Sequence, residues 1–260
     1  MAEDRPLWIA TAASDSAMKM MAEGLKRSSQ QHDMTESPIF QEVVKHLGEQ
    51  RTVVDIGAGV GRFSKPLAQA GCTISAVEPS AEMRAYLQTV IHENNLENRV
   101  TVVADSWPAP HPLRVEVALG AFVIHFASDP VAFVRAMDAA ATRRCILAVH
   151  VDPMMPFVQE IWPYFHPDQE PPQMAVFADI YPKLLAADIV ADVKIIHESR
   201  GPRFRDKTSV LNMLTNRLDI ADDEQAVARL NQLVQEHSEV WKNPRPTRVA
   251  IISWEPPSDA

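Results

Sequence analysis

The sequence lacks the features that mark membrane and secreted proteins. No uncharged apolar stretch reaches about 18 residues, the length that a membrane-spanning helix needs. The N-terminus also lacks the basic-then-apolar layout of a secretory signal. We therefore expect a soluble cytoplasmic protein with no membrane partner.

Cysteine is almost absent, with only Cys72 and Cys145 in the chain. Both lie in apolar segments that resemble strands, where a thiol usually acts as a small buried hydrophobic group. Metal-ligand spacings such as H-x-x-x-H and C-x-x-C are missing as well. We therefore expect no disulfide framework and no metal site.

Positive charge is in deficit, because 25 Lys and Arg against 34 Asp and Glu give a formal net charge of −9. Non-specific affinity for nucleic acid comes from cationic side chains that neutralise phosphates, so we expect no nucleic-acid partner. One basic stretch, ESRGPRFRDK at 198–207, fits either a solvated turn or an anion site.

Strand-like and helix-like segments alternate through the first 151 positions. Strands are predicted at 51–56, 72–77, 99–104, 115–123 and 144–151, with helices at 14–29, 38–48, 62–70, 81–93 and from 129 onward. Alternation of this kind implies an α/β fold with right-handed crossovers and a mainly parallel sheet, covered by helices on both faces. Later strands at 189–198 and 248–254 bracket two amphipathic helices.

Glycine is scarce, with 8 residues in all, yet three of them fall within five positions of VVDIGAGVGRFSKPLA at 53–68. Gly57, Gly59 and Gly61 follow a predicted strand and precede a predicted helix, the usual place for a nucleotide-like ligand. Glycines there permit positive φ and remove each Cβ that would hold a ligand off the backbone. A purely structural tight turn is the alternative.

The spacing around these glycines favours a ligand without phosphate. The pattern is G-x-G-x-G, whereas the dinucleotide fingerprint is G-x-G-x-x-G, and Arg62 stands where its third glycine would be. Asp55, just before the first glycine, would meet an amino group. About 20 residues after Gly57, Glu78 ends a predicted strand, where its carboxylate can accept hydrogen bonds from both ribose hydroxyls.

The stretch VVADSW ends the third strand, where Asp105 can accept the adenine amino hydrogens and Trp107 offers a ring face. Together with VVDIGAGVGRFSKPLA, AVEPSAEM and VALGAFVIHFASDPVAFVRAM in that order, it resembles the small-molecule class I S-adenosylmethionine-dependent methyltransferases over about 52–151. The resemblance implies S-adenosylmethionine as cofactor. It also implies a Rossmann-like seven-stranded sheet, mainly parallel, with an antiparallel last strand and a helical cap and insertion.

The resemblance implies roles for individual residues. Expected at the cofactor are Asp55, Gly57, Ala58, Gly59, Glu78, Pro79, Asp105, Ser106, Trp107 and Ala121. Expected near the acceptor are Met21, His125, His150, Phe157, Trp162 and His166. An apolar lid over the acceptor is expected from Met18, Met20, Met21, Phe157, Trp162, Tyr164 and Phe165, with ordinary core packing of each as the alternative. His125 is the candidate catalytic base or hydrogen-bond partner, with a structural histidine as the alternative.

The expected reaction is in-line displacement of a sulfonium methyl group by a small organic acceptor. Because the leaving group is already activated, alignment in a dry pocket can supply much of the catalysis, and a missing catalytic dyad excludes nothing. The tetrapeptide of nucleic-acid and protein amide methylases, Asn or Asp, two prolines and an aromatic, is absent. A nicotinamide-dependent oxidoreductase and a catalytically silent cofactor-binding module remain alternatives.

The domain prediction is a single methyltransferase domain over 1–260. Within it we expect an N-terminal helical cap at 1–50, a cofactor-binding core at 51–151 and substrate-side segments at 152–254, with a helical insertion at 206–242. The tail at 255–260 is expected to be flexible. A monomer or a homodimer would both fit the sequence.

Overall fold

The computed structural model describes residues 33–153, 156–171, 173–198, 206–239 and 246–257. The strands are β1 (Thr52–Ile56), β2 (Thr73–Val77), β3 (Val100–Val103), β4 (Val115–Ala121), β5 (Ala141–His150), β6 (Asp192–Glu198) and β7 (Thr247–Trp254). The helices are α3 (Pro38–Lys45), α4 (Ser64–Gln69), α5 (Ala81–Glu93), α6 (Pro130–Ala140), α7 (Pro156–Ile161), α8 (Phe177–Ala186), α9 (Lys207–Arg217) and α10 (Glu224–Glu236), with short 3-10 turns η1 (Met34–Glu36), η2 (Ile124–Phe126) and η3 (Trp162–Tyr164). The predicted helix at 14–29, with Met18, Met20 and Met21, lies outside the described residues.

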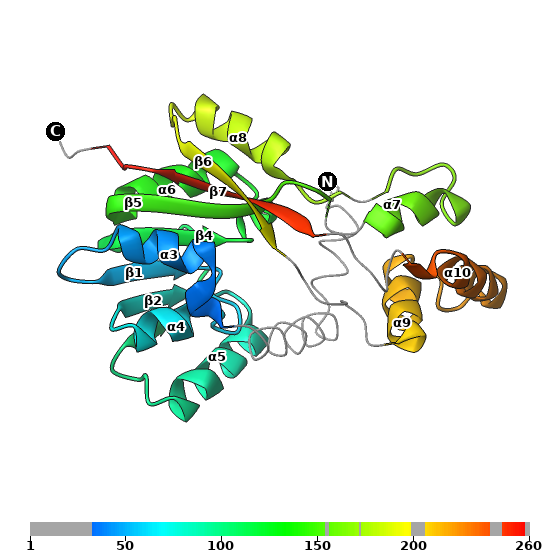
Figure 1. Ribbon diagram of the computed structural model, residues 1–260, viewed down its shortest axis with the longest axis horizontal. Helices are drawn as coiled ribbons and strands as arrows, with labels where there is room; N and C mark the ends of the chain where they lie inside the picture. The colour runs from blue at the N-terminus through cyan, green and yellow to red at the C-terminus, as the bar shows by residue number, and fades with distance from the viewer. Residues whose placement is uncertain (1–32, 154–155, 172, 199–205, 240–245, 258–260) are drawn as a thin grey trace.

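The strands form one seven-stranded sheet in the order β3-β2-β1-β4-β5-β7-β6. The strands β1 to β5 are parallel, whereas β7 runs antiparallel to both β5 and β6. The fold class predicted from the sequence is therefore confirmed, including the helical pair α9 and α10 between the last two strands (Figure 1).

Helices cover both faces of the sheet because its central strands are apolar on both sides. Val53 of β1 belongs to the cluster that includes α3, α4 and α5, and the next residue, Val54, belongs to the cluster on the α6 and α8 face. A parallel strand buried on both faces reads as a continuous apolar run, which is why 51–56 was recognisable as a strand.

The ends of two helices are set by residues that the sequence already marks. The hydroxyl of Ser80 accepts from Met83 N at 3.3 Å and caps α5. Asp129 accepts from the backbone N–H groups of Val131 and Ala132 at the start of α6, where Pro130 occupies the first turn. By contrast, β4 ends two residues before the predicted Val123, because Phe122 adopts φ 59° and turns the chain out of the sheet.

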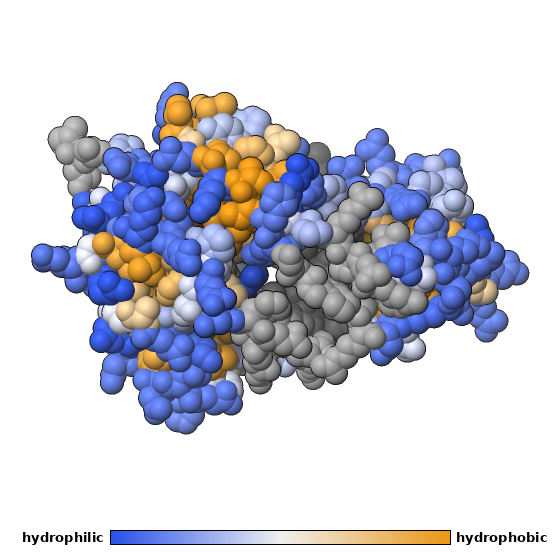
Figure 2. All heavy atoms as spheres, viewed as in Figure 1, coloured by the Kyte–Doolittle hydropathy of each residue, from blue (hydrophilic) through white to orange (hydrophobic). Residues whose placement is uncertain are grey.

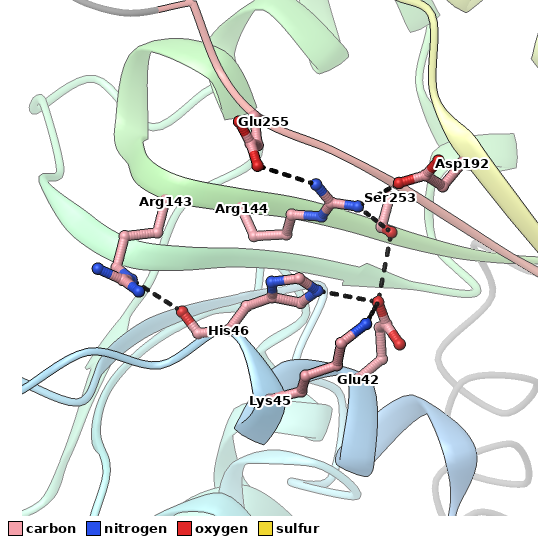
Figure 3. Close-up of polar contacts among 8 residues, drawn as sticks. All are labelled: Glu42, Lys45, His46, Arg143, Arg144, Asp192, Ser253 and Glu255. Atoms are coloured by element: carbon pink, nitrogen blue, oxygen red, sulfur yellow. Dashed lines mark hydrogen bonds and ion pairs between the residues drawn. The ribbon is translucent and has the colours of Figure 1, made fainter.

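A charged network ties together the antiparallel strands at the edge of the sheet (Figure 3). Arg144 Nη2 on β5 lies 2.5 Å from Asp192 Oδ2 on β6 and donates to Ser253 Oγ on β7 at 3.2 Å. Arg144 Nη1 also lies 3.7 Å from Glu255 Oε1. Ser253 Oγ in turn donates to Glu42 Oε1 on α3 at 3.5 Å. One buried guanidinium thus links three strands and the covering helix.

A separate helical cluster is formed by α7, η3, α9 and α10, which lie together to one side of the sheet (Figure 1). Its core contains Phe157, Val158, Ile161, Trp162, Val210, Leu214, Leu218, Ile220, Leu230, Leu233 and Val234. The cluster has its own buried contacts, so α7 and η3 pack mainly against α9 and α10, whereas α8 packs on the sheet.

Candidate functional site

The glycine-rich loop after β1 folds back over the tip of β2. Gly57 N and Ala58 N both donate to Val77 O, at 2.8 and 3.1 Å, and Gly61 N donates to Ala58 O at 2.9 Å. All three glycines have positive φ, with values of 69°, 57° and 87°. The loop therefore needs glycine for its backbone conformation at each of these positions.

The space beside each glycine differs. A Cβ on Gly57 would lie 2.4 Å from Val123 Cγ2, and one on Gly61 would lie 2.7 Å from Leu87 Cδ1. A Cβ on Gly59 would meet only Gly57 O, at 3.9 Å. The missing Cβ at Gly57 and at Gly61 therefore makes room for side chains of the protein, and the contact of Gly57 with a cofactor stays a prediction. Gly59 alone faces open space.

The carboxylate of Glu78, at the tip of β2, is held by two backbone N–H groups. Oε2 accepts from Gly59 N at 2.8 Å and Oε1 accepts from Ser80 N at 2.8 Å. Burial raises the pKa of Glu78, whereas these two hydrogen bonds and nearby Arg84 lower it. Each oxygen keeps further acceptor capacity. The carboxylate is thus fixed beside the loop and can accept hydrogen bonds from a ligand diol.

Asp55 lies on β1 below the loop and is 2% exposed. The hydroxyl of Ser64, in the first turn of α4, donates to Asp55 Oδ2 at 2.6 Å. Burial raises the pKa of Asp55 to about 6, with a further contribution from the charge of Glu78, while the Ser64 hydrogen bonds lower it. Burial therefore makes the ionised form of the Asp55 carboxyl group less stable than it would be in water.

Two buried acids beside an open glycine favour a cationic ligand. Among the described residues, no Lys or Arg side chain forms an ion pair with Asp55 or Glu78. S-adenosylmethionine brings an ammonium group, a sulfonium and a ribose diol, and it carries no phosphate. The donor set and the open space at Gly59 fit this molecule. They do not favour a dinucleotide, whose pyrophosphate would meet two carboxylates.

The other predicted cofactor residues differ in how far they are buried. Ala58 is buried, Asp105 and Ala121 are half-buried, and Pro79 and Ser106 are exposed. The indole of Trp107 donates to Phe133 O on α6 at 3.1 Å, and its ring meets the Phe133 ring edge-on. Packing against α6 therefore explains Trp107 without a ligand, and its contact with adenine stays a prediction.

His125 lies in η2, directly after the tip of β4, with its ring 4.2 Å from that of Phe126. Burial lowers its pKa from 6.5 to about 4. No described residue forms a hydrogen bond with its ring. The imidazole is therefore neutral at physiological pH, available as a hydrogen-bond partner and weak as a proton acceptor.

Aromatic side chains dominate the tips of β4 and β5. The ring of Phe122 stacks on His150, with centroids 4.8 Å apart, and the guanidinium of Arg62 lies 5.4 Å from the Phe122 centroid. Arg62 also lies 3.7 Å from Glu198 Oε1 at the end of β6. The residue after the last loop glycine thus connects the ends of β1, β4 and β6.

Comparison with known proteins agrees with this geometry. Residues 54–149 match the family model described as "Methyltransferase domain". Residues 54–149 are therefore a methyltransferase domain, and the sheet that they belong to has the class I methyltransferase fold. A comparison with curated proteins gave no match.

Solved structures share the fold of this methyltransferase at low sequence identity. Magnesium protoporphyrin IX methyltransferase from Synechocystis PCC 6803, with bound SAH, has 15% identity and a TM-score of 0.55, covering 95% of this chain and 91% of its own. The YcgJ protein of Bacillus subtilis has 15% identity and a TM-score of 0.54, covering 83% and 96%. The cyclase SpnF has 17% identity and a TM-score of 0.54, covering 84% and 79%. At these identities the likeness concerns the fold alone.

The predicted lid of the methyltransferase does not assemble at the strand tips from its described members. Phe157 and Trp162 are buried inside the helical cluster, with Phe165 packed against it, and His166 Nε2 lies 2.8 Å from Leu218 O. Tyr164 is exposed, and the guanidinium of Arg229 lies 5.4 Å from its ring. For these residues the structure shows core and surface packing of the cluster, as the plainer interpretation of each had allowed.

Three contacts of the methyltransferase site are not marked in the sequence. Ser64 reaches Asp55 because the loop places the first turn of α4 beside β1. Val123 reaches Gly57 because Phe122 redirects the chain after β4. The main-chain N–H of Ser80, whose hydroxyl caps α5, also holds Glu78. The spacing of the glycines gives no signal for any of these contacts.

The described helices include none that is both long and apolar enough to cross a membrane. The described part of the chain also brings together no group of three or more His, Cys, Asp or Glu side chains able to hold a metal ion.

Proposed function

We propose that this methyltransferase transfers the methyl group of S-adenosylmethionine to a small organic acceptor with an apolar or aromatic body. The observation that carries the proposal is the Glu78 carboxylate, which Gly59 N and Ser80 N hold beside the loop glycine, Gly59, whose Cβ position has no described side chain within 4 Å. This is the arrangement expected of a group that accepts both hydroxyls of a ribose.

In this proposal the methionine part of the cofactor lies along Gly57 and Gly59, with its ammonium group near Asp55. An ammonium group would favour the ionised form of Asp55, which burial otherwise disfavours. Glu78 holds the ribose, and Asp105 with Ser106 or Trp107 borders the adenine. Bound S-adenosylmethionine supplies a methyl group already activated by its positive sulfur.

The acceptor would lie over the tips of β4 and β5. Phe122, which stacks on the buried ring of His150, is half-buried there, and Phe126 beside His125 is 46% exposed. These surfaces favour an apolar or aromatic acceptor, whereas the predicted lid residues of the helical cluster do not contribute to that preference.

Of the two roles predicted for His125, the hydrogen-bond role is better supported. A pKa of about 4 keeps the ring neutral but makes it a poor acceptor for a proton from a weakly acidic hydroxyl or amine. A neutral imidazole can still hydrogen-bond to an acceptor and hold its attacking atom in line with the methyl group.

The test uses methyl-labelled S-adenosylmethionine and a panel of small aromatic and apolar acceptors that carry hydroxyl, amine, thiol or activated carbon groups. The wild-type chain should transfer label to at least one of them, and Glu78→Ala should transfer none at the same cofactor concentration. Cofactor binding without transfer to any acceptor would favour a catalytically silent module. Stabilisation by a nicotinamide cofactor alone would favour an oxidoreductase.

A further inference from the structure

The two edges of the sheet differ in length and in the side chains that they expose. β3 has 4 residues, Val100–Val103. β6 has 7 residues, Asp192–Glu198, and it pairs within the described residues only with β7. Exposed large hydrophobics gather at β6 and the adjoining end of α8, namely Leu185 (49%), Val190 (83%), Val193 (40%) and Ile195 (43%). We call these four residues the β6 patch; Figure 2 shows hydrophobic side chains over this part of the molecule.

The β6 patch has a defined face. Val193 pairs with Ile252 and Ile195 pairs with Ala250 of β7, and both partners belong to the core cluster on the α8 side. Successive side chains of a strand alternate between faces, so Asp192 and Lys194 point to the opposite face. The free edge of β6 therefore has an apolar face and a charged face.

We propose that β6 is a homodimer interface, in which β6 of a second copy of this chain pairs antiparallel with it across a two-fold axis. An edge strand offers unpaired backbone N–H and C=O groups, which a second edge strand can satisfy. A two-fold interface also requires a surface that is complementary to itself, and the β6 sequence meets that requirement.

Charge selects one register. If Val193 lies on the two-fold axis, Asp192 faces Lys194 of the second copy, and the reverse pair forms by symmetry. Centring the pairing on Lys194 would set two lysines opposite each other, and centring it on Ile195 would set Asp192 opposite Glu198. Like charges directly opposite across a strand pair are destabilising, whereas opposite charges are favourable. Centring it on Ile196 would pair Lys194 with Glu198, but the Glu198 side chain is only 17% exposed beside Arg62, whereas that of Asp192 is 82% exposed.

The Val193 register also aligns the apolar residues. Val193 faces itself, and Ile195 faces Ala191 of the second copy on the same side of the sheet. Asp192 remains available, because its side chain is 82% exposed although Oδ2 lies 2.5 Å from Arg144. A chain with a net charge of −9 repels its copies in general, so a face that pairs acid with lysine is a favourable place for contact.

The first experiment measures the mass of the full chain by sedimentation between about 1 and 100 µM. The wild type should form a dimer in this range, and Val193→Asp should weaken its association by at least about 100-fold, since two buried charges would face each other at the axis. The matched control is Thr101→Asp at an exposed position of the other edge strand, β3, which should associate like wild type. Thermal unfolding and S-adenosylmethionine binding check that each variant is folded.

The second experiment tests the register. Val193→Cys should form an intermolecular disulfide under mild oxidation, because residues directly opposite in an antiparallel pair lie within disulfide reach. Ile195→Cys, on the same face of the same strand, should not, because it faces Ala191. The native Cys72 and Cys145 are buried and do not compete.

A chain that stays monomeric at all concentrations would overturn the proposal, as would a dimer that Val193→Asp leaves intact. Faster crosslinking of Ile195→Cys than of Val193→Cys would overturn the proposed register. These outcomes do not depend on methyl transfer, so the interface and the catalytic function can fail separately.

Discussion

At the tips of β1 and β2, the polar groups are carboxylates held by backbone N–H groups and one serine, whereas at the tips of β4 and β5 they are aromatic and imidazole rings held by stacking. The first region draws on residues within one continuous stretch from Asp55 to Ser80. The second brings together Arg62, Phe122, His150 and Glu198 from four separate elements. A site built from backbone and nearby acids can be recognised from spacing, whereas a site built by packing cannot.

The largest effect is expected at the carboxylate side. Glu78→Ala removes the ribose partner and leaves Gly59 N and Ser80 N without theirs, so S-adenosylmethionine binding should weaken by about 3 kcal/mol, roughly 100-fold or more. Isothermal titration calorimetry measures the change. Glu82→Ala, at a half-buried position in the first turn of α5, is the matched control and should bind like wild type. Equal affinity in both variants would remove Glu78 from the site.

The second prediction separates two glycines that the sequence makes look alike. Gly57→Ala should lower the free energy of unfolding by about 3 kcal/mol, because positive φ is strained for alanine and its Cβ meets Val123. Gly59→Ala should lower it by only about 1 kcal/mol but should weaken cofactor binding, since its Cβ projects into open space. Urea unfolding and calorimetry together test this. Equal destabilisation by both variants would contradict the assigned role of Val123.

The third prediction concerns the cost of burying Asp55. Its native pKa, about 6, lies above the ordinary 3.8, so stability present at low pH is lost as pH rises through about 6. Asp55→Asn does not titrate, so its free energy of unfolding should exceed that of wild type by about 3 kcal/mol at about pH 8, with little difference at about pH 4. Its affinity for S-adenosylmethionine should fall. A variant that is less stable at high pH, with affinity unchanged, would contradict both expectations.

The smallest effect is expected on the ring side. His125→Gln keeps a hydrogen-bonding group, so turnover should fall by about tenfold with cofactor affinity unchanged. In wild type, NMR titration of the ring should give a pKa of about 4, below the ordinary 6.5. Because this pKa is lowered, the contribution of His125 to stability is present above about pH 6.5 and is lost as pH falls through about 4. A midpoint near 6.5 would contradict the burial of the ring.

Much of the fold and part of the site were predictable from the sequence. Apolar runs such as 51–56 and the cap at Ser80 have a local cause, and Glu78 stands at a strand tip about 20 residues after Gly57. The contact of Val123 with Gly57 was not predictable, because it depends on Phe122 adopting positive φ. The packing of Phe157 and Trp162 on α9 and α10 was not predictable either, because an apolar aromatic segment looks the same whether it covers a ligand or packs on helices. Their contact with an acceptor stays a prediction.

We propose that the carboxylate of Glu78 and the open space at Gly59 form the binding site of an adenosyl ligand. A crystal structure of the chain with S-adenosylhomocysteine tests it most directly. We expect both ribose hydroxyls within hydrogen-bond distance of Glu78 and the amino-acid part of the ligand against Gly57 and Gly59. A ligand bound elsewhere, or ribose hydroxyls that do not contact Glu78, would contradict it.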